Sequence, residues 1–126
     1  MKKLFSFLIL AAGLLANPAR AEDFITGLGE IPKMAGLQEN EAASSFFDSP
    51  ELRISIAYLQ GSKIKREKFW QFYTASLAAL GWELDREKDG TEKTFLREDE
   101  ILTIEILTPE KSENEAFAAS FSITPK

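Results

Sequence analysis

The apolar positions of the chain follow one helical period and several strand periods. In the stretch from Lys65 to Trp82, KREKFWQFYTASLAALGW, apolar residues recur every three or four positions, which is typical of a helix with one buried face. Gly81 is placed to end this helix in a left-handed conformation, and Ser62 is placed to cap a first turn at Lys63. The buried stripe is expected to contain Phe69, Phe72, Tyr73, Leu77 and Leu80, with Trp82 folding back on the last turn.

Alternating apolar and polar residues predict strands before and after the helix. The expected strands are Phe46–Phe47, Leu52–Leu59, Trp82–Arg86, Thr94–Arg97, Ile101–Leu107 and Glu115–Ile123. Asp89-Gly90 is a dipeptide typical of hairpin turns, and Asp48-Ser49-Pro50 is a second turn signal. Short turns between consecutive strands favour antiparallel pairing.

The order of elements predicts the fold class. It reads β-β-α-β-β-β-β, which is an α+β fold with an antiparallel sheet of about five or six strands and one long amphipathic helix on one face. A single helix covers only one side of such a sheet. The other face would be wet, and the alternation assigns to it Arg53, Ser55, Glu83, Asp85, Thr103, Glu105, Ser120 and Ser122.

The first 21 residues have the pattern of a cleaved signal peptide. Two lysines precede the apolar run Leu4–Leu15, and the segment ends in Ala19-Arg20-Ala21. The run is shorter than the roughly 20 residues that span a bilayer, so an uncleaved anchor is the less favoured alternative. Cleavage after Ala21 would leave an exported protein with no transmembrane segment.

The mature chain is expected to begin with an irregular leader and continue as a single domain. Residues 22–45 contain closely spaced glycines and no sustained period, whereas residues 46–126 hold the predicted helix and strands. The stretch Ile31–Leu37 would either dock on the domain or belong to a partly ordered tail. Docking is favoured, because a solvated linker is usually richer in serine, threonine and charge.

The charge balance limits the classes of partner, and the absence of cysteine limits how the domain can be stabilised. The chain has 15 basic and 20 acidic residues, a net charge of −5, and removal of residues 1–21 would take away three basic residues and no acid, giving −8. This balance argues against a nucleic-acid partner, which requires a basic face. Because cysteine is absent, an exported domain would depend on its core alone, without disulfides.

Several short motifs together resemble a group of small exported proteins of Gram-negative bacteria that have no assigned activity. The motifs are Ile31–Leu37 (IPKMAGL), Phe47-Asp48-Ser49-Pro50, Arg53-Ile54, Gly61, Phe72-Tyr73 and Leu80-Gly81-Trp82. Lys65 departs from the pattern, since such sequences tend to have a small capping hydroxyl residue there. The resemblance implies a Gram-negative periplasm and implies no reaction.

Two residue types on which most hydrolases depend are missing. Histidine and cysteine are absent, which removes the usual general base, the thiolate nucleophile and the common zinc ligands. Two acidic alternatives stay open. Glu83 and Asp85 could meet Glu92 or Glu105 across the sheet as a carboxylate pair, and Asp85, Glu87 and Asp89 could bind calcium, although the spacing fits no known loop. A solvated acidic surface is the favoured interpretation, because a catalytic acid needs burial and these residues lie at the polar positions of the alternation. No enzyme, metal or cofactor is therefore expected.

The one candidate contact site is a cluster of cations at the start of the predicted helix. Lys63, Lys65, Arg66 and Lys68 lie within six residues of an otherwise acidic chain. Cations at a helix N-terminus oppose the helix dipole by about 0.3 to 1 kcal/mol each, so stability does not explain their position. Backbone N–H groups at that end favour an anion, which predicts contact with an anionic envelope component or an acidic protein. The alternative is a tolerated cluster that pairs with nearby acids.

Trp70 extends this candidate site. Its place at the edge of the apolar stripe would leave the ring half-exposed near the cations, where it could contact a partner. Capping the rim of the core is the alternative. Two functions follow from these patterns: a non-catalytic binding or envelope-accessory module, or a carrier of small ligands or lipids with a cavity between helix and sheet. They differ in whether Phe69, Phe72 and Tyr73 pack tightly against the sheet.

Overall fold

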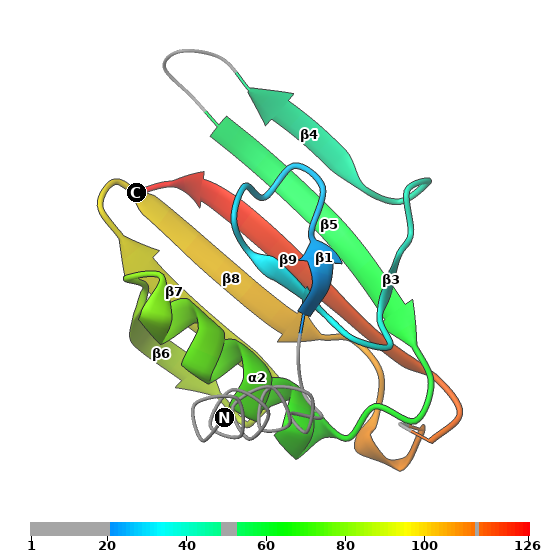
Figure 1. The fold of residues 1–126 in the computed structure, drawn as a ribbon. Coiled ribbons are helices and arrows are strands. Elements are labelled where there is room, and N and C mark those ends of the chain that lie inside the picture. The colour runs from blue at the N-terminus through cyan, green and yellow to red at the C-terminus, as the bar shows by residue number, and fades with distance from the viewer. Residues whose placement is uncertain (1–20, 49–52, 113) are drawn as a thin grey trace, which may run out of the picture.

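A computed structural model describes residues 21–48, 53–112 and 114–126 (Figure 1). The predicted signal segment up to Arg20 lies outside these residues, as do Leu52 and the turn predicted at Ser49-Pro50. Among the described residues, no helix is long and apolar enough to cross a membrane.

The body of the protein is an antiparallel sheet, which confirms the predicted α+β class. Its strands lie in the order β3-β5-β9-β8-β7-β6, and β4 pairs with β5 beside β3, so these two short strands share one edge. The strand bounds are β3 Gln38–Glu39, β4 Ser45–Asp48, β5 Arg53–Gly61, β6 Glu83–Lys88, β7 Glu92–Arg97, β8 Glu100–Ile106 and β9 Phe117–Pro125. Helix α2, Arg66–Ala79, and the short 3-10 helix η1, Glu110–Ser112, complete the domain.

The N-terminal segment covers the part of the sheet that the helix leaves bare. Figure 1 shows α2 in front of β6 and β7, and the hairpin of β1 (Ala21–Phe24) and β2 (Pro32–Met34) in front of β5 and β9. Docking of Ile31–Leu37, the favoured interpretation, is observed, because Ile31, Met34 and Leu37 are buried in the core together with Ile25 and Leu28. The segment expected to be irregular therefore contains three short strands and belongs to the domain.

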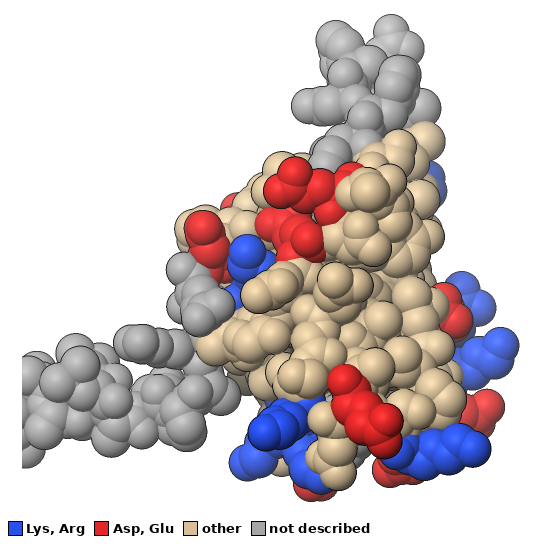
Figure 2. Space-filling view, turned by 90° about the vertical axis from the view of Figure 1, so that its right-hand side faces the viewer, with Lys and Arg blue, Asp and Glu red and all other residues tan. Residues whose placement is uncertain are grey.

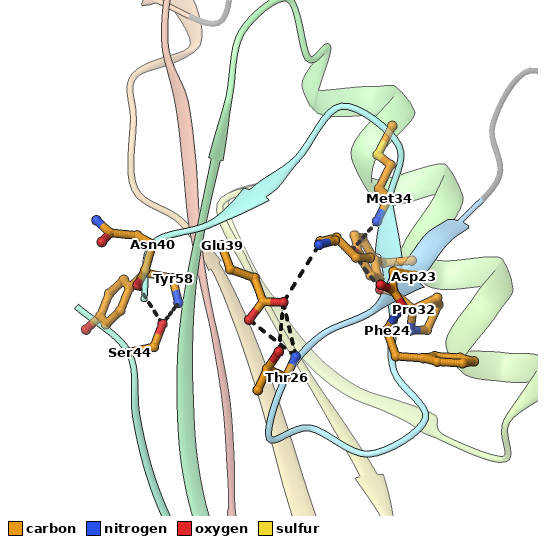
Figure 3. A network of polar contacts seen from close by, with 11 residues as sticks. Asp23, Phe24, Thr26, Pro32, Met34, Glu39, Asn40, Ser44 and Tyr58 are labelled. Atoms are coloured by element: carbon orange, nitrogen blue, oxygen red, sulfur yellow. Dashed lines mark hydrogen bonds and ion pairs between the residues drawn. The ribbon is translucent and has the colours of Figure 1, made fainter. Parts of the chain in front are cut away.

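Polar contacts fix this segment at two points (Figure 3). The Tyr73 hydroxyl donates to the Pro32 carbonyl at 2.9 Å and accepts from the Met34 N–H at 3.0 Å. The Glu39 carboxylate accepts a hydrogen bond from the Thr26 hydroxyl and lies 3.8 Å from the Lys33 Nζ. Both contacts join the N-terminal hairpin to elements of the main sheet or to the helix that covers it.

The predicted orientation of β5 is wrong. Ser55, assigned to the wet face, is only 2 % exposed and lies with Ala57 and Leu59 toward the core, whereas Ile54 on the opposite face is 36 % exposed. Small inward side chains at positions 55 and 57 leave space for the N-terminal segment that packs over β5. The inward phases predicted for β8 and β9 are confirmed, since Leu102 and Ile104 and the alternating residues from Phe117 to Ile123 are buried.

The end of α2 and the following hairpin form as the sequence predicts. Gly81 has a φ of +91°, and the Trp82 N–H donates to the Leu77 carbonyl at 2.9 Å, which is the hydrogen bond of a Schellman cap. Asp89 and Gly90 both have positive φ and connect β6 to β7, as a type I′ turn requires.

The start of α2 differs from the prediction. Lys63 has a φ of +58°, so the chain turns there and the helix begins only at Arg66, which excludes Ser62 as its cap. The N-cap residue is Lys65, whose side chain makes no capping hydrogen bond.

Replacing Lys65 by serine is therefore expected to stabilise the domain by about 1 kcal/mol, because the hydroxyl would accept a hydrogen bond from the N–H of Glu67 or Lys68. The midpoint of urea unfolding measures the change. Lys68→Ser is the matched control, since it removes a positive charge from the same helix end but places the serine inside the helix, where it cannot act as a cap. A Lys65→Ser protein that unfolds at the same urea concentration as the Lys68→Ser protein would contradict the prediction.

Candidate functional site

The four predicted cations lie together at the N-terminal end of α2, and we call Lys63, Lys65, Arg66 and Lys68 the basic end. The three lysines are exposed and Arg66 is half-buried. Glu67 is the acidic residue in the first helical turn. In Figure 2, lysine and arginine side chains gather along the lower end of the molecule with acidic side chains among them.

The loop between β8 and β9 packs against the basic end. An Arg66 guanidinium N–H donates to the Thr108 carbonyl at 3.1 Å, and Lys65 Nζ donates to Asn114 Oδ1 at 3.2 Å. Arg66 therefore ties the helix start to this loop and has a structural role. Lys63, Lys65 and Lys68 are the cations that face solvent most fully.

Trp70 lies at the rim of the core, which was the alternative to an exposed contact. The ring is only 8 % exposed, and its Nε1 donates to the Gly90 carbonyl at 2.8 Å. Lys93 Nζ lies 5.2 Å from the ring centroid. Trp70 thus holds the β6–β7 turn against the helix and leaves little surface for a partner.

Aromatic side chains fill the space between helix and sheet. Phe69 and Tyr73 are fully buried. The ring centroid of Phe69 lies 5.0 Å from that of Phe117, and the ring centroid of Tyr73 lies 5.0 Å from that of Phe121. Phe72 packs on Tyr73 with ring centroids 4.8 Å apart. The place where a carrier would hold its ligand is occupied by the protein's own side chains.

The acidic candidates are only partly brought together. Glu92 and Glu105 are direct cross-strand partners on β7 and β8. Glu83, in contrast, pairs with Leu96, and Asp85 lies where the register between β6 and β7 shifts. The Asp85 Oδ2 atom is 3.4 Å from the Arg86 Nε atom. Within the described residues no group of three or more acids is arranged to hold a metal ion.

A groove that the sequence did not predict lies at the end of the sheet next to the basic end. Its volume is about 390 Å³, and it is lined by Gly36, Gln38, Gln60, Gly61, Ser62 and residues 115–118. These residues come from three separate segments of the chain. The sequence signal was limited to Gln60-Gly61-Ser62, which reads as the end of a strand.

Comparison of the chain with protein-family models, with curated proteins and with solved structures found no match. The resemblance to small exported proteins therefore stays a prediction. The function has to be argued from the geometry of the chain itself.

Proposed function

We propose that the protein is a non-catalytic binding or accessory module of the bacterial envelope, and that the exposed lysines of the basic end contact an anionic envelope component or an acidic partner. One observation carries the proposal. Lys63, Lys65 and Lys68 are exposed at a helix start that lacks a side-chain cap, where positive charge opposes the helix dipole and stability does not account for it.

The composition and the core packing support a binding function over the alternatives. Histidine, the usual general base near neutral pH, and cysteine, the thiolate nucleophile, are both absent from the sequence, which makes an enzyme the less favoured function. A carrier would need an internal cavity, but the rings of Phe69, Tyr73, Phe117 and Phe121 meet between helix and sheet. A contact on the outside of the fold needs neither.

The periplasmic location belongs to the same proposal. It is supported by the basic start, the short apolar run and the Ala-Arg-Ala ending of residues 1–21. The mass of the protein recovered from a periplasmic extract tests it: the mature chain should begin at Glu22, and a protein that retains Met1 would contradict it.

The contact is tested by replacing Lys63, Lys65 and Lys68 with glutamine while Arg66, which holds the loop, is kept. We expect the triple variant to lose binding to vesicles of phosphatidylglycerol and phosphatidylcholine, and to melt at a slightly higher temperature because the dipole is relieved. Binding of the parent should fall steeply with added salt, because charges are screened over about 8 to 10 Å at physiological ionic strength.

A matched control changes the same amount of charge elsewhere. Arg86, Lys88 and Lys126 are exposed and lie outside the basic end, so replacing them with glutamine alters the net charge equally. The control should keep its vesicle binding. If both triple variants bind alike, or if the parent shows no salt-sensitive binding to these vesicles or to an acidic protein in periplasmic extract, the proposal is wrong.

A further inference from the structure

Two of the residues that line the groove beside the basic end, Gly36 and Gly61, are held as glycines by the backbone around them. A Cβ built on Gly61 would lie 2.6 Å from the Gly36 carbonyl oxygen, so the two backbones approach too closely for any other residue at position 61. Gly36 has a φ of +96°, a conformation that side chains disfavour. The lining thus includes two glycines together with the small residues Ala116 and Ala118.

The lining also carries uncharged hydrogen-bonding groups. Gln38 and Gln60 are cross-strand partners on β3 and β5, and both are exposed. Neither amide side chain has a hydrogen-bond partner among the described residues. Ser62 adds a hydroxyl, and Glu115 is the one charged residue of the lining.

This set of groups selects the chemistry of a ligand. Each glutamine amide offers two N–H donors and an acceptor oxygen, and the serine hydroxyl both donates and accepts, so the groove suits ligand hydroxyl groups, which also do both. An anionic group would lie beside Glu115 with no cation in the lining to bind it. The volume of about 390 Å³ falls in the lower part of the range of about 300 to 1,000 Å³ that is usual for small-molecule sites.

Figure 2 looks onto the sheet edge at β3 and β4. A broad central area has no charged side chains, and it lies between a mainly acidic group above and a mixture of basic and acidic side chains below. In the groove itself Glu115 is the one charged residue of the lining, which favours a neutral ligand over an anionic one.

We infer that the groove lined by Gln38, Gln60, Ser62 and Glu115 binds a neutral saccharide unit. The inference goes beyond the proposed contact of the basic end, because it depends on amides and a hydroxyl and on no lysine. The two surfaces adjoin, since Ser62 precedes Lys63 and Glu115 follows Asn114, which holds Lys65. A glycan with anionic substituents would therefore be able to contact both.

A peptide is the other ligand that pairs with amides, but the groove suits it less well. Peptide recognition usually combines backbone hydrogen bonds with pockets for side chains. The apolar lining here consists of two alanines and of Phe117, which is almost fully buried. A hydroxyl-rich ring needs no such pocket.

Chemical-shift titration of the folded full-length mature protein tests the inference. The probes are glucose, galactose and N-acetylglucosamine, with trialanine and inorganic phosphate as comparators. At least one sugar should shift the backbone amides of Gly36, Gly61 and Ala118 saturably, and high salt should not abolish the shift. Gln60→Leu should weaken that binding about tenfold or more by removing its hydrogen bonds.

The matched control is Gln71→Leu, the same change on the exposed face of α2, which should leave sugar binding unaltered. The amide spectrum of each variant reports whether it is folded, and Gln38→Leu serves as the second groove variant. The inference is overturned if no sugar gives a saturable shift, if trialanine does so instead, or if folded Gln60→Leu and Gln38→Leu bind sugar as tightly as the parent. The two proposals can fail separately. If phosphate shifts only the amides of Lys63, Lys65 and Lys68 and no sugar binds, the groove inference is wrong while the proposed contact of the basic end is supported.

Discussion

Replacing Trp82 by alanine is expected to lower the free energy of unfolding by about 3 to 5 kcal/mol, a large share of the 5 to 15 kcal/mol typical of a domain. The Trp82 ring is 3 % exposed, and the Arg97 guanidinium carbon lies 4.5 Å from its centroid. Arg97 also donates to the Leu80 carbonyl and forms an ion pair with Glu30. Truncation of the ring would therefore leave a cavity where the helix end, β7 and the N-terminal segment meet. Urea denaturation of the purified variant measures the loss.

Trp82→Phe separates the packing of the ring from its polar group. The Trp82 Nε1 is buried and has no hydrogen-bond partner among the described residues, so its removal costs no hydrogen bond. We expect phenylalanine to keep most of the stability that alanine loses. An alanine variant that unfolds at the same urea concentration as the parent would show that Trp82 is not part of the core.

The elements that the sequence predicts well are those with a local cause. The cap at Gly81 and the turn at Asp89-Gly90 depend on residues that tolerate positive φ, and such residues are visible in the chain itself. The helix start was predicted less well, because the positive φ of Lys63 belongs to a residue type that gives no such signal.

The orientation of β5 could not be read from its alternation. Alternation separates the two faces of a strand, but the face that is buried depends on what packs there. Ile54, Ile56 and Tyr58 are the larger set, so they were assigned to the core, yet the N-terminal segment covers Ser55 and Ala57 instead. The prediction missed this because the covering segment has no periodicity of its own.

The candidate site also has features that the sequence predicts and features that it does not. The cations of the basic end were visible because they are close together in the sequence. The structural contacts of Arg66 and Trp70 were not, since their partners Thr108 and Gly90 lie some distance along the chain and are reached through backbone carbonyls. The groove forms where three separate segments of the chain meet, and such a meeting cannot be predicted from composition or periodicity.

Replacing Tyr73 by phenylalanine is expected to cost about 1 to 3 kcal/mol, because the Met34 N–H and the Pro32 carbonyl would lose their buried partner. The ring itself stays, so its packing against Phe69 and Phe121 is kept. The loss should therefore appear first in the N-terminal hairpin, as faster amide hydrogen exchange at Met34 than in the parent. Equal exchange and equal stability in the two proteins would show that the hydroxyl does not hold this segment.

The same hydroxyl predicts how stability depends on pH. Burial raises the pKa of Tyr73 well above its ordinary value of 10, although the hydrogen bond from Met34 opposes this shift. Above about pH 10 the unfolded chain releases this proton while the folded protein keeps it, so Tyr73 stabilises the fold below that pH and its contribution is lost as the pH rises further. The parent should lose up to about 1.4 kcal/mol per pH unit from this group, and the Tyr73→Phe protein should lack that component. Urea unfolding of both proteins between neutral pH and pH 11 measures it, and parallel pH profiles would mean that the Tyr73 hydroxyl is not buried in the folded state.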